Sequence, residues 1–335
     1  MTPTIHDVAR QANTSKSTVS RYLNGEKIKA KTQEAIDRAI KELNYHRNAN
    51  ARNLVLNKTN TIAVVVDSIT NNFYSQIIAG IESVAGKYGY NCIYLSWTSN
   101  MQYDNEASFL KLVLEGKADG IILVSFKKRD EAELQIFEQS SYPVVLVGDN
   151  GGRTDLQCVD VDNSTGIAEM VKYLHRIGHS KIAYISGPRE AAATKHRLRG
   201  YLETMKSLQL SVHPEWIIDS DWSNKGGSIA MEELLQHSDF TAVIASNDET
   251  AIGALRALQQ RGFQIPRDFS VAGFDDITIA NWVYPALTTI RQPFRDIGIC
   301  AAQRLMEMLS GDISDQVQPT LLKPELIIRD SCGKI

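Results

Sequence analysis

The sequence lacks the features of membrane proteins and of metal-binding proteins. No window holds the ~18 apolar residues that a transmembrane helix needs, and the first residues form no apolar signal region. We therefore expect a protein without membrane contact that stays in the cytoplasm. The four cysteines have no CxxC spacing and the seven histidines do not cluster, so neither a metal site nor another cofactor is predicted.

Common enzyme motifs are missing as well. The sequence contains no GxSxG, HExxH, GxxxxGK[ST] or GxGxxG pattern. A sugar-processing α/β enzyme would need a base or nucleophile constellation, and the sequence offers only scattered carboxylates. We therefore predict that the protein is not an enzyme.

Charge is unevenly distributed along the chain. The first sixty residues hold eleven Lys/Arg and five Asp/Glu, whereas the whole chain has a net charge of −3, so the remaining residues are acidic. A basic head on an acidic protein is the asymmetry expected when one domain meets the phosphates of nucleic acid.

The basic segment shows the pattern of a helix-turn-helix. Residues 4–12 form one short amphipathic pattern, and residues 15–23, rich in Lys, Ser, Thr and Arg, form a second that ends at Asn24-Gly25. A third helical pattern begins near Lys31-Thr32 and runs to Leu43. Two short helices joined by a tight turn and supported by a third are typical of a DNA-binding head, which we place at residues 1–46.

Local signals support these helix boundaries. Thr4 and Asp7 have the spacing of a capping box, Ser15 is a good N-cap, and Asn13 tolerates the positive φ that the turn needs. The outer face of the second helix is predicted to contact DNA. We expect Lys16, Ser17 and Arg21 to face the major groove and the other DNA contacts to be Thr4, Ser15, Thr18, Ser20 and Asn24.

Residues 47–60 separate this head from the rest of the chain. The segment is polar and rich in asparagine. A helix this short is marginal in water on its own. We therefore predict a hinge that orders only against a partner, although an ordinary interdomain linker would have the same composition.

From Thr61 onward, short Val/Ile/Leu strands alternate with amphipathic helices. This alternation predicts parallel sheets covered by helices on both faces. The segment exceeds one ordinary α/β core, so we expect two parallel-sheet subdomains. The first is placed at about 61–160 and 291–320, and the second at about 161–290 and 321–335.

Polar and aromatic residues follow several of these strands and predict a ligand site. Ligands of such sheets bind beyond the carboxyl ends of the strands, and an aromatic plate with Asp, Asn and Arg suits a sugar. Taken singly, Asp275 could cap a helix, Arg197 could pair with a carboxylate and Trp222 could be core. The predicted ligand-binding residues are Asp149, Arg197, Trp222, Asn247 and Asp275, with Phe73 and Tyr74 as the opposing wall.

A basic run at residues 195–199 could favour an acidic sugar or a sugar phosphate. We interpret it instead as a solvated helix face.

Several motifs together resemble the lactose-repressor (LacI/GalR) family of bacterial transcription regulators, and the resemblance covers nearly the whole chain. In the head and hinge they are Thr4-Ile5-x-Asp7-Val8-Ala9, Ser15-x-x-Thr18-Val19-Ser20-Arg21-x-Leu23-Asn24-Gly25, Leu43-Asn44-Tyr45 and Asn48-Ala49-x-Ala51-Arg52-x-Leu54. In the core they include Arg197-x-x-Gly200-Tyr201, Ser246-Asn247-Asp248, Gly273-Phe274-Asp275-Asp276 and Pro285-Ala286-Leu287-Thr288-Thr289-Ile290. The sequence departs from the family pattern at Asn13-Thr14, Arg47 and Asn72.

The resemblance implies a periplasmic-binding-protein-like type I core behind an all-α helix-turn-helix head. It implies three chain crossings between the subdomains, which we place near Val161, Leu287-Thr288 and Thr320-Leu321. In the hinge it implies that Leu54 wedges into the DNA minor groove with Ala51 packed beside it.

The function implied is repression of a carbohydrate-utilisation operon. A homodimer would bind a near-palindromic DNA operator, and a small-molecule effector, a sugar, sugar acid or sugar phosphate, would control the affinity. We expect dimer contacts around residues 76–87 and, because no leucine heptad follows the last strand, no tetramer. Two alternatives remain: a nucleobase-type co-repressor, or a sugar-binding receptor without regulatory DNA binding, which should have a secretion signal and no basic head.

Overall fold

The computed structural model describes residues 3–46, 58–69, 72–96, 106–125, 129–153, 155–237, 239–312 and 319–335. The chain separates into two compact units, Met1–Thr59 and Asn60–Ile335. Within the described residues, no helix is both long and apolar enough to cross a membrane.

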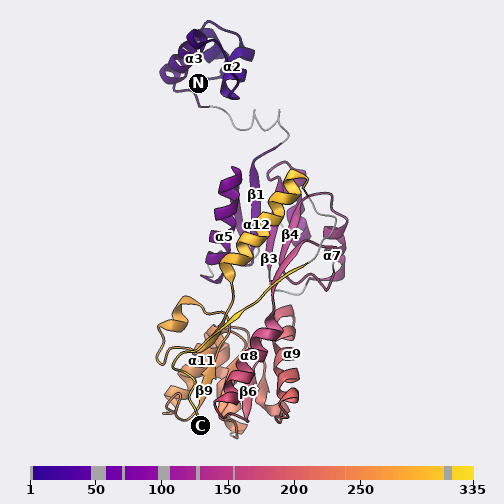
Figure 1. The fold of residues 1–335 in the computed structure, drawn as a ribbon, viewed down its shortest axis with the longest axis vertical. Coiled ribbons are helices and arrows are strands. Elements are labelled where there is room, and N and C mark those ends of the chain that lie inside the picture. Colours follow the sequence, from indigo (N-terminus) through magenta and orange to yellow (C-terminus); the bar gives the residue numbers. More distant parts are fainter. Residues whose placement is uncertain are drawn as a thin grey trace. The chain divides into compact units, whose positions relative to one another are not determined.

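The small unit is a three-helix head made of α1 (Ile5–Gln11), α2 (Lys16–Leu23) and α3 (Ala30–Leu43) (Figure 1). Val8, Val19 and Ile36, one from each helix, are fully buried at its centre. Burial of one apolar stripe per helix is what stabilises helices as short as these. The expected three-helix arrangement is confirmed.

Two details of the head concern backbone conformation. Asn13, in the turn between α1 and α2, has a φ of +46°, as its residue type led us to expect. The start of α3 was placed slightly too late, because the amides of Thr32 and Gln33 already donate to the carbonyl of Lys29. The helix therefore begins at Ala30, without a capping side chain that the sequence could reveal.

The larger unit contains a six-stranded parallel sheet with the strand order β11-β5-β4-β3-β1-β2. Its strands are nearly continuous apolar runs, as parallel sheets buried on both faces require. They are β1 (Thr61–Val66), β2 (Asn91–Ser96), β3 (Gly120–Ser125), β4 (Val144–Gly148), β5 (Cys158–Val161) and β11 (Thr320–Leu322). This sheet and its helices are the first subdomain.

Helices cover both faces of the first sheet (Figure 1). On one face α5 and α12 pack together and against the strands. They can approach closely because Gly298 has no side chain. A Cβ added at this position would lie 2.1 Å from the carbonyl oxygen of Ile77. The helices of this subdomain are η1 (Asn72–Tyr74), α5 (Ser75–Ala85), η2 (Gly86–Tyr88), η4 (Glu106–Leu110), α6 (Lys111–Leu114), α7 (Glu131–Glu138) and α12 (Phe294–Ser310).

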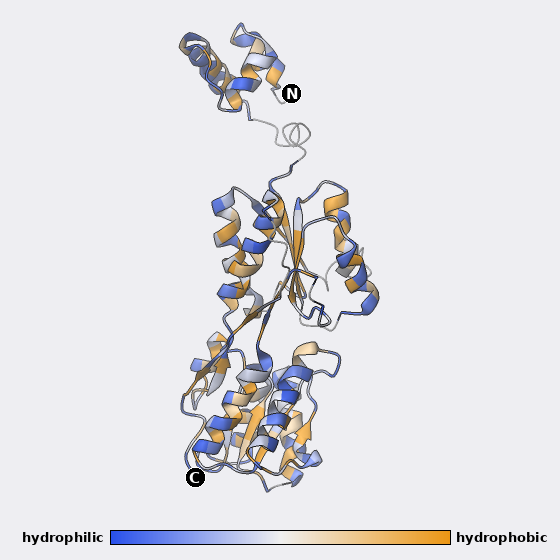
Figure 2. Cartoon of the chain, turned by 45° about the vertical axis from the view of Figure 1, so that its right-hand side comes forward, coloured by the Kyte–Doolittle hydropathy of each residue, from blue (hydrophilic) through white to orange (hydrophobic). Residues whose placement is uncertain are grey.

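The second subdomain is built on a four-stranded parallel sheet with the order β7-β6-β8-β9. The strands are β6 (Ile182–Ile185), β7 (Ile217–Ile218), β8 (Ala242–Ala245) and β9 (Ser270–Ala272). Their apolar residues lie between helical layers whose outer faces are hydrophilic (Figure 2). The helices are α8 (Asn163–Arg176), α9 (Ala192–Ser207), η5 (Pro214–Trp216), α10 (Asn224–Leu234), η6 (Leu235–His237), α11 (Asp248–Gln260) and η7 (Thr278–Asn281).

The chain passes between the two sheets three times. The first passage follows β5 at Val161, as expected, whereas the other two run through the antiparallel ribbon of β10 (Thr289–Arg291) and β12 (Glu325–Ile327). The second and third passages both lie a few residues further along the chain than the predicted crossings. Thr288 still bridges to β9 in the second sheet, and β11 still pairs with β5 in the first. The predicted fold class, a helical head and a two-sheet α/β core, is confirmed.

Candidate functional site

The outer face of α2 presents the polar side chains that were predicted to contact DNA. Lys16, Ser17 and Arg21 are exposed, and Thr18 and Ser20 are half-buried. The Oγ of Ser15 accepts a hydrogen bond of 3.1 Å from the amide of Thr18 and so fixes the first turn. The amino-terminal end of this helix is therefore both capped and accessible, as a groove-reading helix requires.

At the start of α1, the predicted pairing of Thr4 with Asp7 is present. The Asp7 carboxylate accepts bonds from the amide of Thr4 (2.9 Å) and from its hydroxyl (2.7 Å). These hydrogen bonds lower the pKa of Asp7, so it stays ionised at the positive end of the helix.

Arg21 is engaged in an ion pair that the sequence pattern did not reveal. Its Nε lies 2.7 Å from Oε2 of Glu26, and both side chains are more than half exposed, at 60% and 52%. Exposed pairs of this kind contribute only ~0–1 kcal/mol. Arg21 can therefore leave Glu26 for a stronger partner at small cost.

Further cations extend this surface beyond the predicted set. Lys27, Lys29 and Lys31 are exposed on and beside the segment that joins α2 to α3. Only the overall charge excess of the first sixty residues pointed to them. The predicted hinge residues Ala51 and Leu54 lie outside the described residues.

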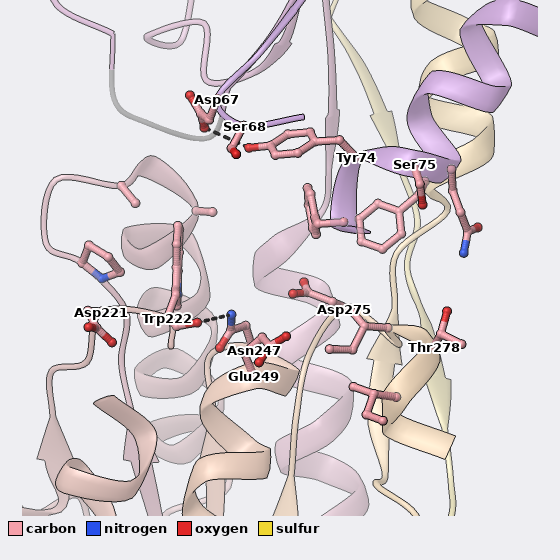
Figure 3. A pocket seen from close by; sticks show the side chains of 18 of the residues that line it. Asp67, Ser68, Tyr74, Ser75, Asp221, Trp222, Asn247, Glu249, Asp275 and Thr278 are labelled. Carbon is pink, nitrogen blue, oxygen red and sulfur yellow. Dashed lines mark hydrogen bonds between the residues drawn. The ribbon is translucent and has the colours of Figure 1, made fainter. Parts of the chain in front are cut away.

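A cavity of about 860 Å³ lies in the larger unit and is lined by both subdomains. Figure 3 shows Asp67, Ser68 and Tyr74 on the wall of the first subdomain, facing side chains of the second. Six of the seven residues predicted from strand ends and loops line it: Phe73, Tyr74, Arg197, Trp222, Asn247 and Asp275. The carboxyl edges of the two sheets thus meet at one site.

The seventh predicted residue, Asp149, does not line the cavity. It follows β4, but its carboxylate accepts hydrogen bonds from the amides of Gly151 (3.0 Å) and Arg129 (3.4 Å). Arg129 also donates to the carbonyl of Asp149. Asp149 therefore links its own loop to the segment around Arg129.

Arg197 lies on α9, lines the cavity and is almost fully buried. Its Nε donates to Asn163 Oδ1 (2.7 Å), and its Nη1 donates to the Ser246 carbonyl (2.5 Å). Its Nη2 lies 3.5 Å from Asp275 Oδ1, and the guanidinium covers the ring of Phe274 at 3.8 Å. Two of its five N–H donors thus form hydrogen bonds within the protein, and its charge is paired with Asp275.

Asp275 presents a carboxylate to the cavity just beyond β9 (Figure 3). Gln292 donates to its Oδ1 at 2.6 Å, the same oxygen that faces Arg197, so Oδ2 can accept hydrogen bonds from a ligand. Burial raises the pKa of Asp275 to about 6, although Arg197 and Gln292 favour the ionised form and the charge on Glu249 opposes it. A ligand that donates hydrogen bonds would favour ionisation.

Trp222 is fixed as one wall of the cavity. Its φ is +65°, its Nε1 donates to Ser246 Oγ at 3.0 Å, and its carbonyl accepts from Asn247 Nδ2 at 3.2 Å. Asn247 also caps α11, because its Oδ1 accepts from the amide of Thr250 at 2.9 Å. Asn247 therefore lines the cavity, yet its amide group positions Trp222 and α11.

Gly187 gives the indole of Trp222 its space. A Cβ at this position would lie 2.1 Å from Trp222 Nε1 and 2.7 Å from Thr194 Oγ1. We expect Gly187→Ala to displace the indole and to change the near-ultraviolet circular dichroism of the protein. Gly86→Ala, whose added Cβ meets nothing within 4 Å, is the control. The same spectrum for Gly187→Ala and wild type would contradict the assignment, and a Trp222→Phe background should remove the effect.

Several lining residues were not predicted. Asp221 directly precedes Trp222, and Glu249 lies two residues after Asn247 on the first turn of α11, so both are close in sequence to predicted residues. Trp282, in a loop without periodicity, gave no signal. The remaining unpredicted lining residues are Asp67, Ser68, Ser75, Gln76, Pro188, Glu190, Ala191, Ala193, Ile277, Thr278, Ile279 and Phe294.

The basic run at residues 195–199 contributes only Arg197 to the cavity. Lys195 and Arg199 are exposed on α9, and Arg199 donates to Ser164 Oγ at 3.1 Å. The interpretation of this run as largely a solvated helix face agrees with their positions.

Comparisons with known proteins follow the same division of the chain. Residues 4–48 match the family model "Bacterial regulatory proteins, lacI family", and residues 171–332 match "Periplasmic binding protein-like domain". The chain is 36% identical to the HTH-type transcriptional repressor PurR of Vibrio vulnificus, over 99% of both chains.

Two solved structures are similar over nearly the whole chain. The lac repressor dimer bound to operator and the anti-inducer ONPF has a TM-score of 0.89 and 27% identity, covering 99% of this chain and 100% of that one. The complex of the transcriptional regulator CelR with cellobiose has a TM-score of 0.73 and 29% identity, covering 98% and 99%. With its helix-turn-helix head and two-sheet core, this chain belongs to the lacI family of bacterial transcriptional regulators.

Proposed function

We propose that this regulator is a homodimeric repressor that binds a near-palindromic operator and releases or holds it according to the occupancy of the cavity. The observation that carries the proposal is the cavity itself, because both subdomains line it. A ligand held between them fixes their relative angle. It can shift the equilibrium only by its differential affinity for the two angles, typically ~1–3 kcal/mol.

DNA contact is assigned to α2 and to the hinge. Lys16, Ser17 and Arg21 would read base edges, and the neighbouring hydroxyls would bind phosphates. Leu54, with Ala51 beside it, would wedge between base pairs at the centre of the operator; the family resemblance supports this part. The unstacking costs a few kcal/mol and is offset by added contact on the bent DNA.

The effector is proposed to be a carbohydrate. Trp222 offers an aromatic face, and Asp275 offers an oxygen that can accept from hydroxyl groups. The similar CelR structure contains cellobiose. A nucleobase-type co-repressor would also stack on an indole, so it remains the alternative. We propose no enzymatic activity, and a cytoplasmic location because the operator is there.

The assembly is proposed to be a two-fold dimer, because one head reads too few base pairs for a specific site. Tyr284 is 91% exposed on the second subdomain, and Tyr88 is exposed just beyond α5 on the first. Exposed aromatic side chains of this kind are typical of protein interfaces. We expect a dimer in sedimentation at micromolar concentration and a monomer for Tyr284→Glu. A monomeric or tetrameric wild type would refute the assembly.

Gel shifts test the proposed function as a whole. Genomic fragments would be titrated with the protein in the absence and presence of candidate sugars and nucleobases. Selective retention of one fragment, changed by one compound, is the expected result. Equal binding of all fragments, with every compound inert, would refute operator control by a ligand.

A further inference from the structure

We propose that the second-subdomain wall of the cavity selects uncharged or positively charged hydroxyl-bearing ligands and rejects anionic ones, sugar acids and sugar phosphates included. The proposal rests on the proposed function of the cavity as the effector site. It narrows the choice among the three classes of effector that the sequence left open, namely sugars, sugar acids and sugar phosphates.

Carboxylates are the first part of the argument. Four of them line the wall of the second subdomain: Glu190, Asp221, Glu249 and Asp275. Figure 3 shows the last three on the same wall as Trp222, with Asp67 on the opposite wall. Asp221 stays ionised because hydrogen bonds from Ser223 lower its pKa. An anionic ligand would therefore meet several like charges among the lining residues.

The only cation among the described lining residues does not offset these charges. Arg197 is 4% exposed, and its guanidinium is held by Asn163, the Ser246 carbonyl and Asp275. Phosphate and carboxylate groups are normally bound by a free guanidinium or ammonium group. Among the described residues of this wall, no exposed guanidinium or ammonium group is therefore available to an anion.

The charges of the wall also repel one another. Glu249 opposes the ionisation of Asp275, which burial already disfavours. A second negative group from a ligand would add to this repulsion, in a site where burial weakens screening. Hydroxyl donors or a protonated amine would relieve it.

Neutral ligands and cations find complementary groups at the same place. The face of Trp222 accepts the apolar face of a sugar ring or a cation. Oδ2 of Asp275 accepts from a hydroxyl, and the hydroxyl group of Thr278 lies on the same wall. Selection against anions therefore does not weaken binding of an uncharged sugar.

Charged quenchers of Trp222 fluorescence test the negative charge of the cavity wall, and this test does not require that the effector be known. In a Trp97→Phe/Trp282→Phe background, Trp222 and Trp216 remain, and Trp216 is buried. Iodide, caesium and acrylamide would be compared at constant ionic strength, each normalised to N-acetyltryptophanamide. We expect iodide to quench at least threefold less than caesium. A further Trp222→Phe change should remove the difference, and operator binding reports correct folding.

Charge removal gives the matched comparison. Adding Glu249→Gln and Asp221→Asn should bring the normalised quenching constant of iodide close to that of caesium. Asp239→Asn, which changes an exposed ion pair on the surface, should leave the quenching constant of iodide unchanged. Equal quenching by iodide and caesium before these changes would overturn the proposal.

A ligand panel separates this proposal from the proposed function. Calorimetry would compare the binding of glucose, glucosamine, glucose 6-phosphate and glucuronate. Any effector found by gel shift would be compared with its own phosphorylated form. Binding of an anionic form as tight as the neutral form would overturn the charge selection and leave operator control standing. If iodide and caesium quench differently but no compound changes operator binding, the proposed function is refuted and the charge selection stands.

Discussion

Replacing Asp275 with alanine is expected to abolish the effector response while operator affinity in the absence of ligand remains within about threefold of wild type. The change removes an acceptor for ligand hydroxyls, and hydrogen bonds to charged groups contribute about 1.5–3 kcal/mol each. Two such bonds correspond to a loss of effector affinity of roughly a hundredfold or more. Operator titrations at increasing effector concentration measure both quantities.

Two variants control this result. Asp275→Asn keeps the shape of the side chain but not its charge, and Asp239→Asn removes an exposed carboxylate that pairs with Lys181 and does not line the cavity. Because burial raises the pKa of Asp275 to about 6, the wild-type response should also weaken as the pH falls through that value, since the protonated carboxyl is a poorer acceptor. A normal effector response in both Asp275→Ala and Trp222→Ala would place control outside the cavity.

Replacing Arg21 with alanine is expected to weaken operator binding by about 10- to 100-fold, because a good contact between arginine and a base edge discriminates by ~1–3 kcal/mol. Binding to random DNA should fall only by the few-fold that one phosphate contact contributes. Gel shifts on operator and random duplexes at one fixed salt concentration give the two ratios. Equal losses on both would show that Arg21 contacts only phosphate.

Glu26→Gln is the companion variant. Glu26 is the partner of Arg21 in the free head, at 2.7 Å. Its neutralisation should strengthen operator binding by a few-fold, since exposed pairs of this type contribute ~0–1 kcal/mol. Weaker binding would indicate that Glu26 holds Arg21 in the orientation that reads DNA.

Much of the fold followed from periodicity alone. The apolar runs at Thr61–Val66 and Val144–Gly148 are buried strands because side chains on both faces of a parallel sheet must be apolar. The places where the chain leaves a sheet were less predictable. Thr288 and Thr320 resemble linker residues in sequence, yet both still pair with a neighbouring strand, and pairing depends on partners far along the chain.

The site was predictable wherever topology determined it. Strand ends located Trp222 and Asp275, because parallel strands bring their carboxyl ends to one edge. They could not tell that Asp149, at the end of another strand, accepts hydrogen bonds from the amides of Gly151 in its own loop and of Arg129, which follows β3. The pairing of Arg21 with Glu26 was missed for a similar reason, since the direction of a side chain is decided by neighbours that the turn brings close.

The position of α12 in the sequence constrains the order in which the chain can fold during its synthesis. Phe294, Ile297, Ala301 and Leu305 cover one face of the first sheet, and β11 closes its edge only at Thr320–Leu322. By then the ribosome has already released the four strands of the second sheet. Until α12 has been synthesised, β1 to β5 therefore expose an apolar face, which is the condition under which nascent chains recruit chaperones or aggregate. The second subdomain also waits for the end of the chain, because the amide of Val271 in β9 donates to the carbonyl of Ser331. Premature termination before Phe294 should thus yield insoluble fragments.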